Sequence, residues 1–192
     1  MSRRIGLFGG TFNPIHHGHL RLARAIQRRA GLDEVWLLVT PQNPWKEQHT
    51  LLADDIRLQM VRAATRRCRH LVASDYEFHL LRPSYTWNTL QALSVDYPDV
   101  EFVLLVGGDN WQRFPQWFRH EDILEHYHIV VYPRSGSDVD ITSLPDSVQV
   151  VEAPLMDVSS TQIRQLVHDG LPYRHLVPAA VADIISRRRL YL

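Results

Sequence analysis

Short apolar runs of strand length recur along the chain and alternate with segments that have the spacing of amphipathic helices. Continuous apolar runs of about four to eight residues are typical of strands buried on both faces of a parallel sheet. We expect strands at residues 5–8, 35–39, 102–106 and 129–132, with weaker candidates at 148–151 and 71–73. Apolar residues three and four apart predict helices at residues 20–29, 53–67, 86–95, 123–126, 161–168 and 179–188.

This alternation predicts an α/β fold, because parallel strands are joined by crossover connections that are usually helices. We expect a Rossmann-like open parallel sheet with helices on both faces. The length of 192 residues fits a single domain spanning 1–192. In such sheets ligands bind outside the carboxyl ends of the strands, where helix N-termini also lie. Residues that directly follow a predicted strand are therefore the first candidates for a site.

The charge balance restricts the classes of partner. Lys plus Arg and Asp plus Glu both total 21, so no net charge draws the chain to nucleic acid or to anionic lipid. No apolar run approaches the roughly 20 residues of a membrane span. We therefore expect neither a nucleic-acid partner nor a membrane partner. The single cysteine, Cys68, and the lack of a signal-peptide pattern favour a cytoplasmic location.

The first candidate site follows the first predicted strand, in GLFGGTFNPIHHGHLRLAR. Gly9 and Gly10 allow a sharp turn and close approach of the backbone to a ligand. His16 and His19 are spaced i, i+3 at the start of a predicted helix, where unpaired amides and the helix dipole favour anions. The segment is neither a Walker A loop nor GxGxxG. The alternatives are histidines that only cap or pack, and a zinc site, which would need further ligands.

A second candidate site lies in DVSSTQIRQL, at residues 157–166. Ser159, Ser160 and Thr161 precede a helical pattern, where hydroxyls serve as N-caps. Arg164 lies one turn inside this helix, and a guanidinium there can bind phosphate oxygens in a bidentate manner. A well-capped helix without a ligand is the alternative.

Together, GGTFNPIHHGHL and the Ser/Thr-rich turn followed by arginine resemble the two signatures of the HxGH nucleotidylyltransferases. The resemblance implies that His16 and His19 bind the ATP phosphates and stabilise the pentacovalent transition state at the α-phosphorus. It implies that Ser159, Thr161 and Arg164 hold the β- and γ-phosphates, with Arg164 catalytic alongside the histidines. It also implies ATP contacts, including one to the ribose hydroxyls, at Gly9, Gly10, Thr11, Phe12, Gly107 and Asp109.

Three further stretches resemble the bacterial-type nicotinate-nucleotide adenylyltransferases: RPSYTWNTL at 82–90, LLVGGDNWQRFPQWFRHEDIL at 104–124 and PQNPWKEQH at 41–49. The resemblance covers nearly the whole chain and implies adenylyl transfer from ATP to nicotinate mononucleotide, giving deamido-NAD and pyrophosphate in NAD biosynthesis. Trp117 would stack on the nicotinate ring, and the amides of Thr86 and Phe118 would bind its carboxylate. Lys46 would reach the nucleotide phosphate. Mg²⁺ would be bound mainly through the ATP phosphates, with no metal site on the chain itself.

Several alternatives stay open at this point. Core packing is an alternative role for Trp117, and helix capping is one for Asp109. Asn13 and Trp45 stand where the family commonly has Asp and His. Phosphopantetheine adenylyltransferases share the HxGH scaffold, class I aminoacyl-tRNA synthetases share a similar first motif, and the Arg-rich helices could belong to a nucleic-acid-binding module. The pattern is compatible with a monomer or a homodimer.

Overall fold

The computed structural model describes residues 2–41, 51–133, 144–153 and 157–192, which are arranged around one parallel sheet. Six strands are hydrogen-bonded in the order β3-β2-β1-β4-β5-β6, and each neighbouring pair is parallel. The predicted Rossmann-like sheet is confirmed, and the weak candidate at 71–73 is a true strand. The strands are β1 (Arg3–Gly10), β2 (Glu34–Val39), β3 (Leu71–Ser74), β4 (Val100–Gly107), β5 (His128–Tyr132) and β6 (Val148–Val150).

Helices connect these strands and follow the last one. They are α1 (His17–Arg29), α2 (Asp54–Thr65), α3 (Thr86–Asp96), α4 (Gly108–Trp111), α5 (His120–His126), α6 (Ser160–His168) and α7 (Ala179–Arg188). Helix α1 begins before the predicted residue 20, because His16 caps it. Helix α4 was not predicted, because it begins among glycines, which are poor helix formers. In the ranges described, no helix is long and apolar enough to traverse a bilayer.

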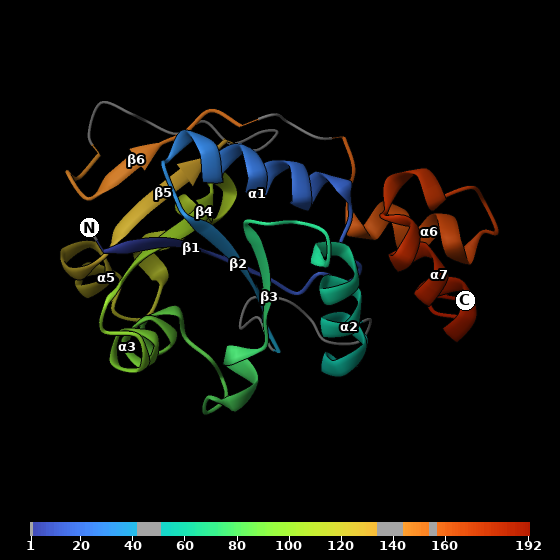
Figure 1. Ribbon diagram of the computed structural model, residues 1–192, viewed down its shortest axis with the longest axis horizontal. Coiled ribbons are helices and arrows are strands. Elements are labelled where there is room, and N and C mark those ends of the chain that lie inside the picture. The colour runs from blue at the N-terminus through green and yellow to red at the C-terminus, as the bar shows by residue number, and fades with distance from the viewer. Residues whose placement is uncertain (1, 42–50, 134–143, 154–156) are drawn as a thin grey trace.

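Alternate residues of the strands point to opposite faces of the sheet and form two hydrophobic cores. On one face, Val103 and Leu105 of β4 pack with α1, α2, α6 and α7. On the other face, Phe102, Leu104 and Val106 pack with α3 and α5. Helices therefore cover both faces of the sheet, as predicted (Figure 1).

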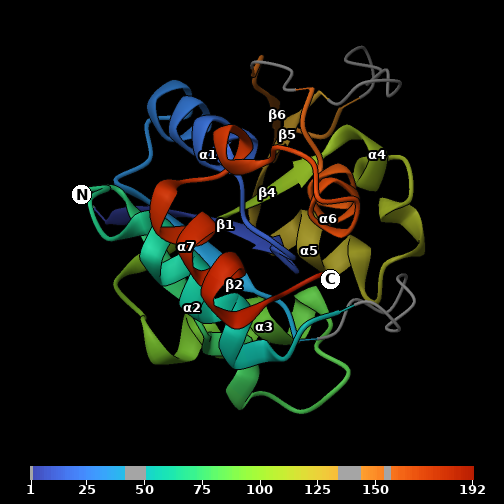
Figure 2. The same ribbon diagram turned by 90° about the vertical axis from the view of Figure 1, so that its right-hand side faces the viewer.

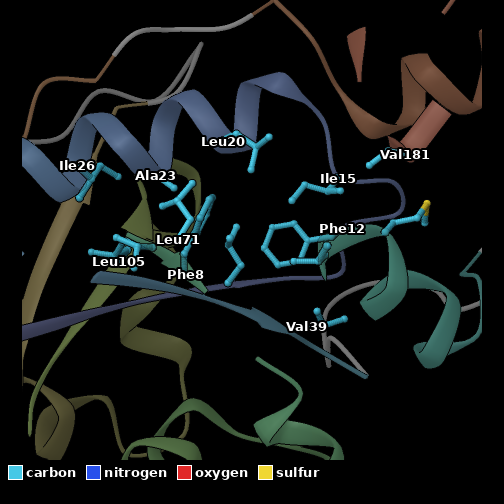
Figure 3. Close-up of a cluster of buried hydrophobic side chains, with 14 of the residues drawn as sticks. Phe8, Phe12, Ile15, Leu20, Ala23, Ile26, Val39, Leu71, Leu105 and Val181 are labelled. Atoms are coloured by element: carbon cyan, nitrogen blue, oxygen red, sulfur yellow. The ribbon is translucent and has the colours of Figure 1, made fainter. Parts of the chain in front are cut away.

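The first core fixes α1 against the sheet. Leu20, Ala23 and Ile26 project from α1 toward Phe8 of β1 and Leu105 of β4 (Figure 3). All five residues are buried. Burial of a large aliphatic or aromatic side chain contributes about 1.5–3 kcal/mol. The core thus holds the first turn of α1 at a fixed position beyond the end of β1.

Strand β1 lies at the point where the order of the strands along the chain reverses. It pairs with β2 on one side and with β4 on the other. In open parallel sheets, ligands bind at the carboxyl ends of the strands beside such a switch point. Helices α6 and α7 lie beyond the carboxyl end of β1 (Figures 1 and 2). The fold therefore brings the carboxyl-terminal helices to the edge of the sheet where the first candidate site lies.

Candidate functional site

The chain leaves β1 through a tight turn that is packed around Phe12. This residue has a φ of 46°, and its buried ring lies edge-on to Phe8 at 5.8 Å and to His19 at 5.1 Å between centroids. A Cβ atom on Gly10 would lie 2.9 Å from Cζ of Phe12, so only glycine fits there. Gly9 is exposed at the strand end. The side chain of Phe12 belongs to the core, so any ATP contact at Phe12 must come from its main chain.

His16 and His19 form a reciprocal cap at the start of α1. Nδ1 of His16 accepts a hydrogen bond from the amide of His19 (3.4 Å), and Nδ1 of His19 accepts one from the amide of His16 (3.3 Å). The two rings stack with centroids 3.7 Å apart. Because both Nδ1 atoms accept, these hydrogen bonds assign the proton of each neutral ring to Nε2. The two histidines therefore do cap the helix, as one of the alternatives stated. This arrangement leaves the Nε2–H group as the donor of each ring.

Arg57 of α2 holds the turn after β1 from the core side. Its Nη1 donates to the carbonyl oxygens of Thr11 (2.7 Å) and Thr40 (3.0 Å), and its Nε donates to that of Leu52 (2.9 Å). The side chain is 0 % exposed and pairs with Asp54. Burial lowers the pKa of the Arg57 guanidinium, and the Asp54 carboxylate opposes that effect. The ends of β1 and β2 are thereby tied to one buried cation.

The second candidate motif lies against the first. The hydroxyl of Ser160 donates to the carbonyl oxygen of Pro14 (2.9 Å), and Nη1 of Arg164 donates to that of Asn13 (2.9 Å). Nη2 of Arg164 donates to Oγ1 of Thr161 (3.2 Å). The two motifs found separately in the sequence therefore form one site at the carboxyl end of β1.

A glycine and a serine complete this junction. Ser159 is the N-cap of α6, and its hydroxyl accepts from the amide of Gln162 (3.1 Å), as predicted. A Cβ atom on Gly18 would lie 2.9 Å from both Nδ1 of His16 and Cγ1 of Val158. The glycine between the motif histidines therefore allows α1 to touch the second motif closely.

Strand β4 ends beside β1 and leads directly into α4. Gly107 is the N-cap of α4, and Asp109 lies exposed in its first turn. The alternative that Asp109 caps this helix is therefore wrong. Because β4 pairs with β1, its carboxyl end faces the same edge of the sheet as Gly10.

Aromatic residues gather where α3 begins. Thr86 is the first residue of α3, so its amide has no partner within the helix. The ring of Tyr85 lies against that of Phe118, with centroids 5.0 Å apart and Phe118 49 % exposed. Trp117 is half-buried and packs against Phe114 at 5.3 Å, so core packing accounts for part of its surface. The segment at Tyr85–Thr86 and the segment at Trp117–Phe118, both predicted to bind the nicotinate group, are thus in contact with each other.

Two remaining predictions concern the proline-rich loop and metals. Lys46 and Trp45 lie outside the described residues. Among the residues that the structure describes, no group of three or more His, Cys, Asp and Glu side chains could hold a metal ion.

Comparison with known proteins agrees with this arrangement of motifs. The family model described as cytidylyltransferase-like matches residues 7–166. A Bacteroides fragilis protein named "probable nicotinate-nucleotide adenylyltransferase" is 47 % identical over 96 % of this chain and 92 % of its own length. A Cytophaga hutchinsonii protein with the same name is 44 % identical over 98 % of each chain. The chain belongs to the nicotinate-nucleotide adenylyltransferase family.

The fold of this family member is also found in solved structures. The Plasmodium falciparum nicotinic acid mononucleotide adenylyltransferase complexed with NaAD superimposes with a TM-score of 0.81. The match covers 98 % of this chain and 97 % of that chain at 18 % identity. At this identity the likeness concerns the fold.

Sequence reasoning missed several residues of this nicotinate-nucleotide adenylyltransferase site. Arg57 shares a helical face with the buried Met60 and Val61, and a charged residue on an apolar face is a signal that could have indicated it. No comparable signal marks the hydroxyl of Tyr191, which donates to Oδ1 of Asn13 (3.0 Å), and none indicates that Ser160, a predicted capping hydroxyl, donates instead to the carbonyl oxygen of Pro14. Their partners lie far away in the sequence.

Proposed function

We propose that the chain transfers the adenylyl group of ATP to nicotinate mononucleotide, giving deamido-NAD (nicotinate adenine dinucleotide) and pyrophosphate. The observation that supports this most strongly is the junction of the two motifs, where Ser160 and Arg164 bind the Pro14 and Asn13 carbonyls. Membership of the nicotinate-nucleotide adenylyltransferase family supports the choice of substrates.

The reaction forms one bond to the α-phosphorus and breaks another. An oxygen of the mononucleotide 5′-phosphate attacks the α-phosphorus, and the bond from phosphorus to the α,β-bridging oxygen breaks. The electron pair leaves with pyrophosphate. The attacking phosphate is largely dianionic at neutral pH, because its second pKa is about 6. The chain therefore needs no general base, and it acts by positioning and charge stabilisation.

The histidines serve the α-phosphate in this proposal. Their Nε2–H groups lie at the N-terminus of α1, where the helix dipole also favours negative charge. The reciprocal cap fixes both rings before substrate arrives, so little reorganisation is needed as charge develops on the α-phosphate oxygens. His16 and His19 are therefore the catalytic donors.

The second motif serves the leaving group. Arg164 is held by its bonds to Asn13 and Thr161, which orient the plane of the guanidinium. A guanidinium has five N–H donors, so it can bind the β- and γ-phosphates while these bonds persist. The hydroxyls of Ser159 and Thr161 lie at the N-terminus of α6 and complete this half of the site.

The remaining ATP contacts come from the ends of β1 and β4. The main chain from Gly9 to Phe12 faces the triphosphate, Gly107 lies against the nucleotide, and Asp109 in the first turn of α4 accepts hydrogen bonds from the ribose hydroxyls. The two strand ends flank the switch point of the sheet, where a nucleotide binds in folds of this class.

The nicotinate half lies around the start of α3. The amide of Thr86 at this helix N-terminus suits a carboxylate, and the Tyr85–Phe118 contact brings the amide of Phe118 into the same region. Trp117 offers a flat apolar face to the pyridine ring. Lys46 binds the nucleotide phosphate in this proposal.

Magnesium enters with ATP as part of the substrate. The groups gathered at the motif junction are imidazole, guanidinium and amide donors together with the hydroxyls of α6, and none of them is a carboxylate, so the junction suits phosphate oxygens better than a cation. Mg²⁺ prefers oxygen ligands and keeps several of its waters. It therefore reaches the site bound to the ATP phosphates, and its charge offsets that of the leaving group.

A pyrophosphate-release assay with ATP and Mg²⁺ tests the proposal against three acceptors in parallel: nicotinate mononucleotide, nicotinamide mononucleotide and phosphopantetheine. We expect release with nicotinate mononucleotide, and deamido-NAD identified by mass spectrometry. Turnover with phosphopantetheine alone, or with none of the three, would overturn the assignment.

A further inference from the structure

The segment that follows α7 turns back to the site with two residues in the left-handed region. Arg189 has a φ of 52° and Tyr191 a φ of 65°. Residues other than glycine adopt this conformation at a cost, so tertiary contacts must hold it. The ring of Tyr191 packs against the first hydrophobic core, and this contact helps to hold the segment in that conformation.

The hydroxyl of Tyr191 supplies a second, polar contact. It donates to Oδ1 of Asn13 at 3.0 Å. Asn13 is only 4 % exposed, and its carbonyl oxygen accepts from Nη1 of Arg164. One buried residue therefore receives a hydrogen bond from α6 and another from the segment after α7.

The charges around Tyr191 are consistent with its role as a donor. Burial raises the pKa of the Tyr191 hydroxyl, while the guanidinium groups of Arg164 and Arg57 act in the opposite direction. The hydroxyl therefore keeps its proton. Arg57 also binds the carbonyl oxygen of Thr11, so the turn from Thr11 to Asn13 is held from three separate elements.

We propose that Tyr191 is a positioning residue for the ATP phosphate site and that it acts through Asn13. The proposal rests on the proposed function and adds a residue that carries no phosphate contact of its own. The turn at Thr11–Asn13 leads into the histidine cap, and the carbonyl of Asn13 orients Arg164. Fixing the side chain of Asn13 therefore fixes both halves of the phosphate site relative to each other.

The test uses Tyr191→Phe, which removes the hydroxyl and keeps the ring, and Tyr173→Phe as the matched control. The hydroxyl of Tyr173 pairs with Oγ of Ser186 (3.0 Å), away from the turn. With the second substrate saturating, we expect Tyr191→Phe to raise KM for ATP roughly 3- to 10-fold, the range for one hydrogen bond. KM for nicotinate mononucleotide should stay unchanged, and Tyr173→Phe should leave both constants within about 2-fold of wild type.

These KM values distinguish a positioning role of Tyr191 from a general effect on folding. Loss of folded protein lowers kcat but leaves both KM values as they are. Combining Tyr191→Phe with Asn13→Ala should raise KM for ATP no further than Asn13→Ala alone, because the two act in series. An unchanged KM for ATP in Tyr191→Phe, or additive effects in the double variant, would overturn the inference. A wild-type protein that releases no pyrophosphate would instead overturn the proposed function.

Discussion

The two motif histidines show how a single side chain can serve structure and chemistry with different atoms. In each ring Nδ1 closes the cap of α1, while the hydrogen-bond pattern leaves the ring proton on Nε2. An imidazole can do both because its two nitrogens point in different directions. A lysine, with one ammonium group and no acceptor, could not form this cap.

Replacing His19 with alanine removes one of the two donors proposed for the α-phosphate. We expect kcat to fall about 100- to 1000-fold, the usual loss for a donor that stabilises transition-state charge. The half-lost cap should cost about 1 kcal/mol of stability, measurable by urea denaturation. His17→Ala, on the same helix turn, is the control and should keep near-normal turnover. Near-normal turnover in His19→Ala would remove this residue from the mechanism.

Glu77 is a buried carboxyl beside the turn that leads into α3. Oγ1 of Thr89 donates to its Oε1 (3.0 Å), whereas no partner in the described residues lies in hydrogen-bond geometry with Oε2. Burial raises the pKa of Glu77, and the nearby hydroxyls of Thr89, Thr40 and Ser84 oppose this only in part. The neutral acid is therefore the form that the fold prefers.

This preference makes stability depend on pH. The stabilisation is complete below the ordinary pKa of 4.5 and is lost as the pH rises through the higher pKa of the folded state. The limiting slope is about 1.4 kcal/mol per pH unit. Glu77→Gln cannot ionise, so urea denaturation at several pH values should show it gaining on wild type as the pH rises. Glu125→Gln, at an exposed site on α5, is the control, and a constant difference for Glu77→Gln would contradict the assignment.

Among the elements, α2 connects the ends of β1 and β2 beside the junction of the two motifs. Its Arg57 binds the carbonyls at the ends of β1 and β2, two strands whose register is set elsewhere in the sheet. Burying the Arg57 guanidinium costs desolvation energy, even with three carbonyl partners. Removing it would leave each of these carbonyl oxygens as an unsatisfied buried acceptor. The helix is thereby locked to the two strand ends.

Arg57→Met should lower the free energy of unfolding by about 3–5 kcal/mol, because it leaves three buried carbonyl oxygens without their donor and removes one of the two ion-pair partners of Asp54. Arg62→Met is the control on the same helix. Arg62 is exposed and forms a surface ion pair with Asp75, so its loss should cost less than about 1 kcal/mol. If urea denaturation gave the two variants the same free energy of unfolding, the buried hydrogen bonds of Arg57 would stabilise the fold no more than a surface ion pair does.

For the whole molecule, the site joins parts of the fold that are distant in sequence. Bonds from α6 and from the segment after α7 reach the turn after β1. A ligand that binds both motifs should therefore stabilise the entire fold rather than one element, by mass action on the folded state.

MgATP at about 100 times its Kd should add about 2.7 kcal/mol of stability, which raises Tm by roughly 5–10 °C for a chain of this length. Differential scanning fluorimetry measures the shift. Arg164→Ala should reduce it, because this substitution removes the main cation of the leaving-group half. A Tm that MgATP does not move would contradict the placement of ATP at the junction.

The fold class and the residues of the two motifs could be predicted from the sequence. The strand β4 and the helix α3 follow from local periodicity, and Ser159 caps α6 as its position predicted. The prediction was wrong where the local signal is weak, as at the start of α1, where two histidines stand in place of the usual capping residues. The alternative that Asp109 caps a helix is excluded only by the structure, in which Gly107 takes that position.

The sequence by itself determined the alternation of strands and helices and the chemistry at the ends of β1 and before α6, because these depend on neighbouring residues. Only the tertiary structure decided which residues hold that chemistry in place. Arg57, Ser160 and Tyr191 bind partners 46, 146 and 178 residues away. Such pairings arise from the packing of the helices beyond the end of β1, and no local pattern encodes them.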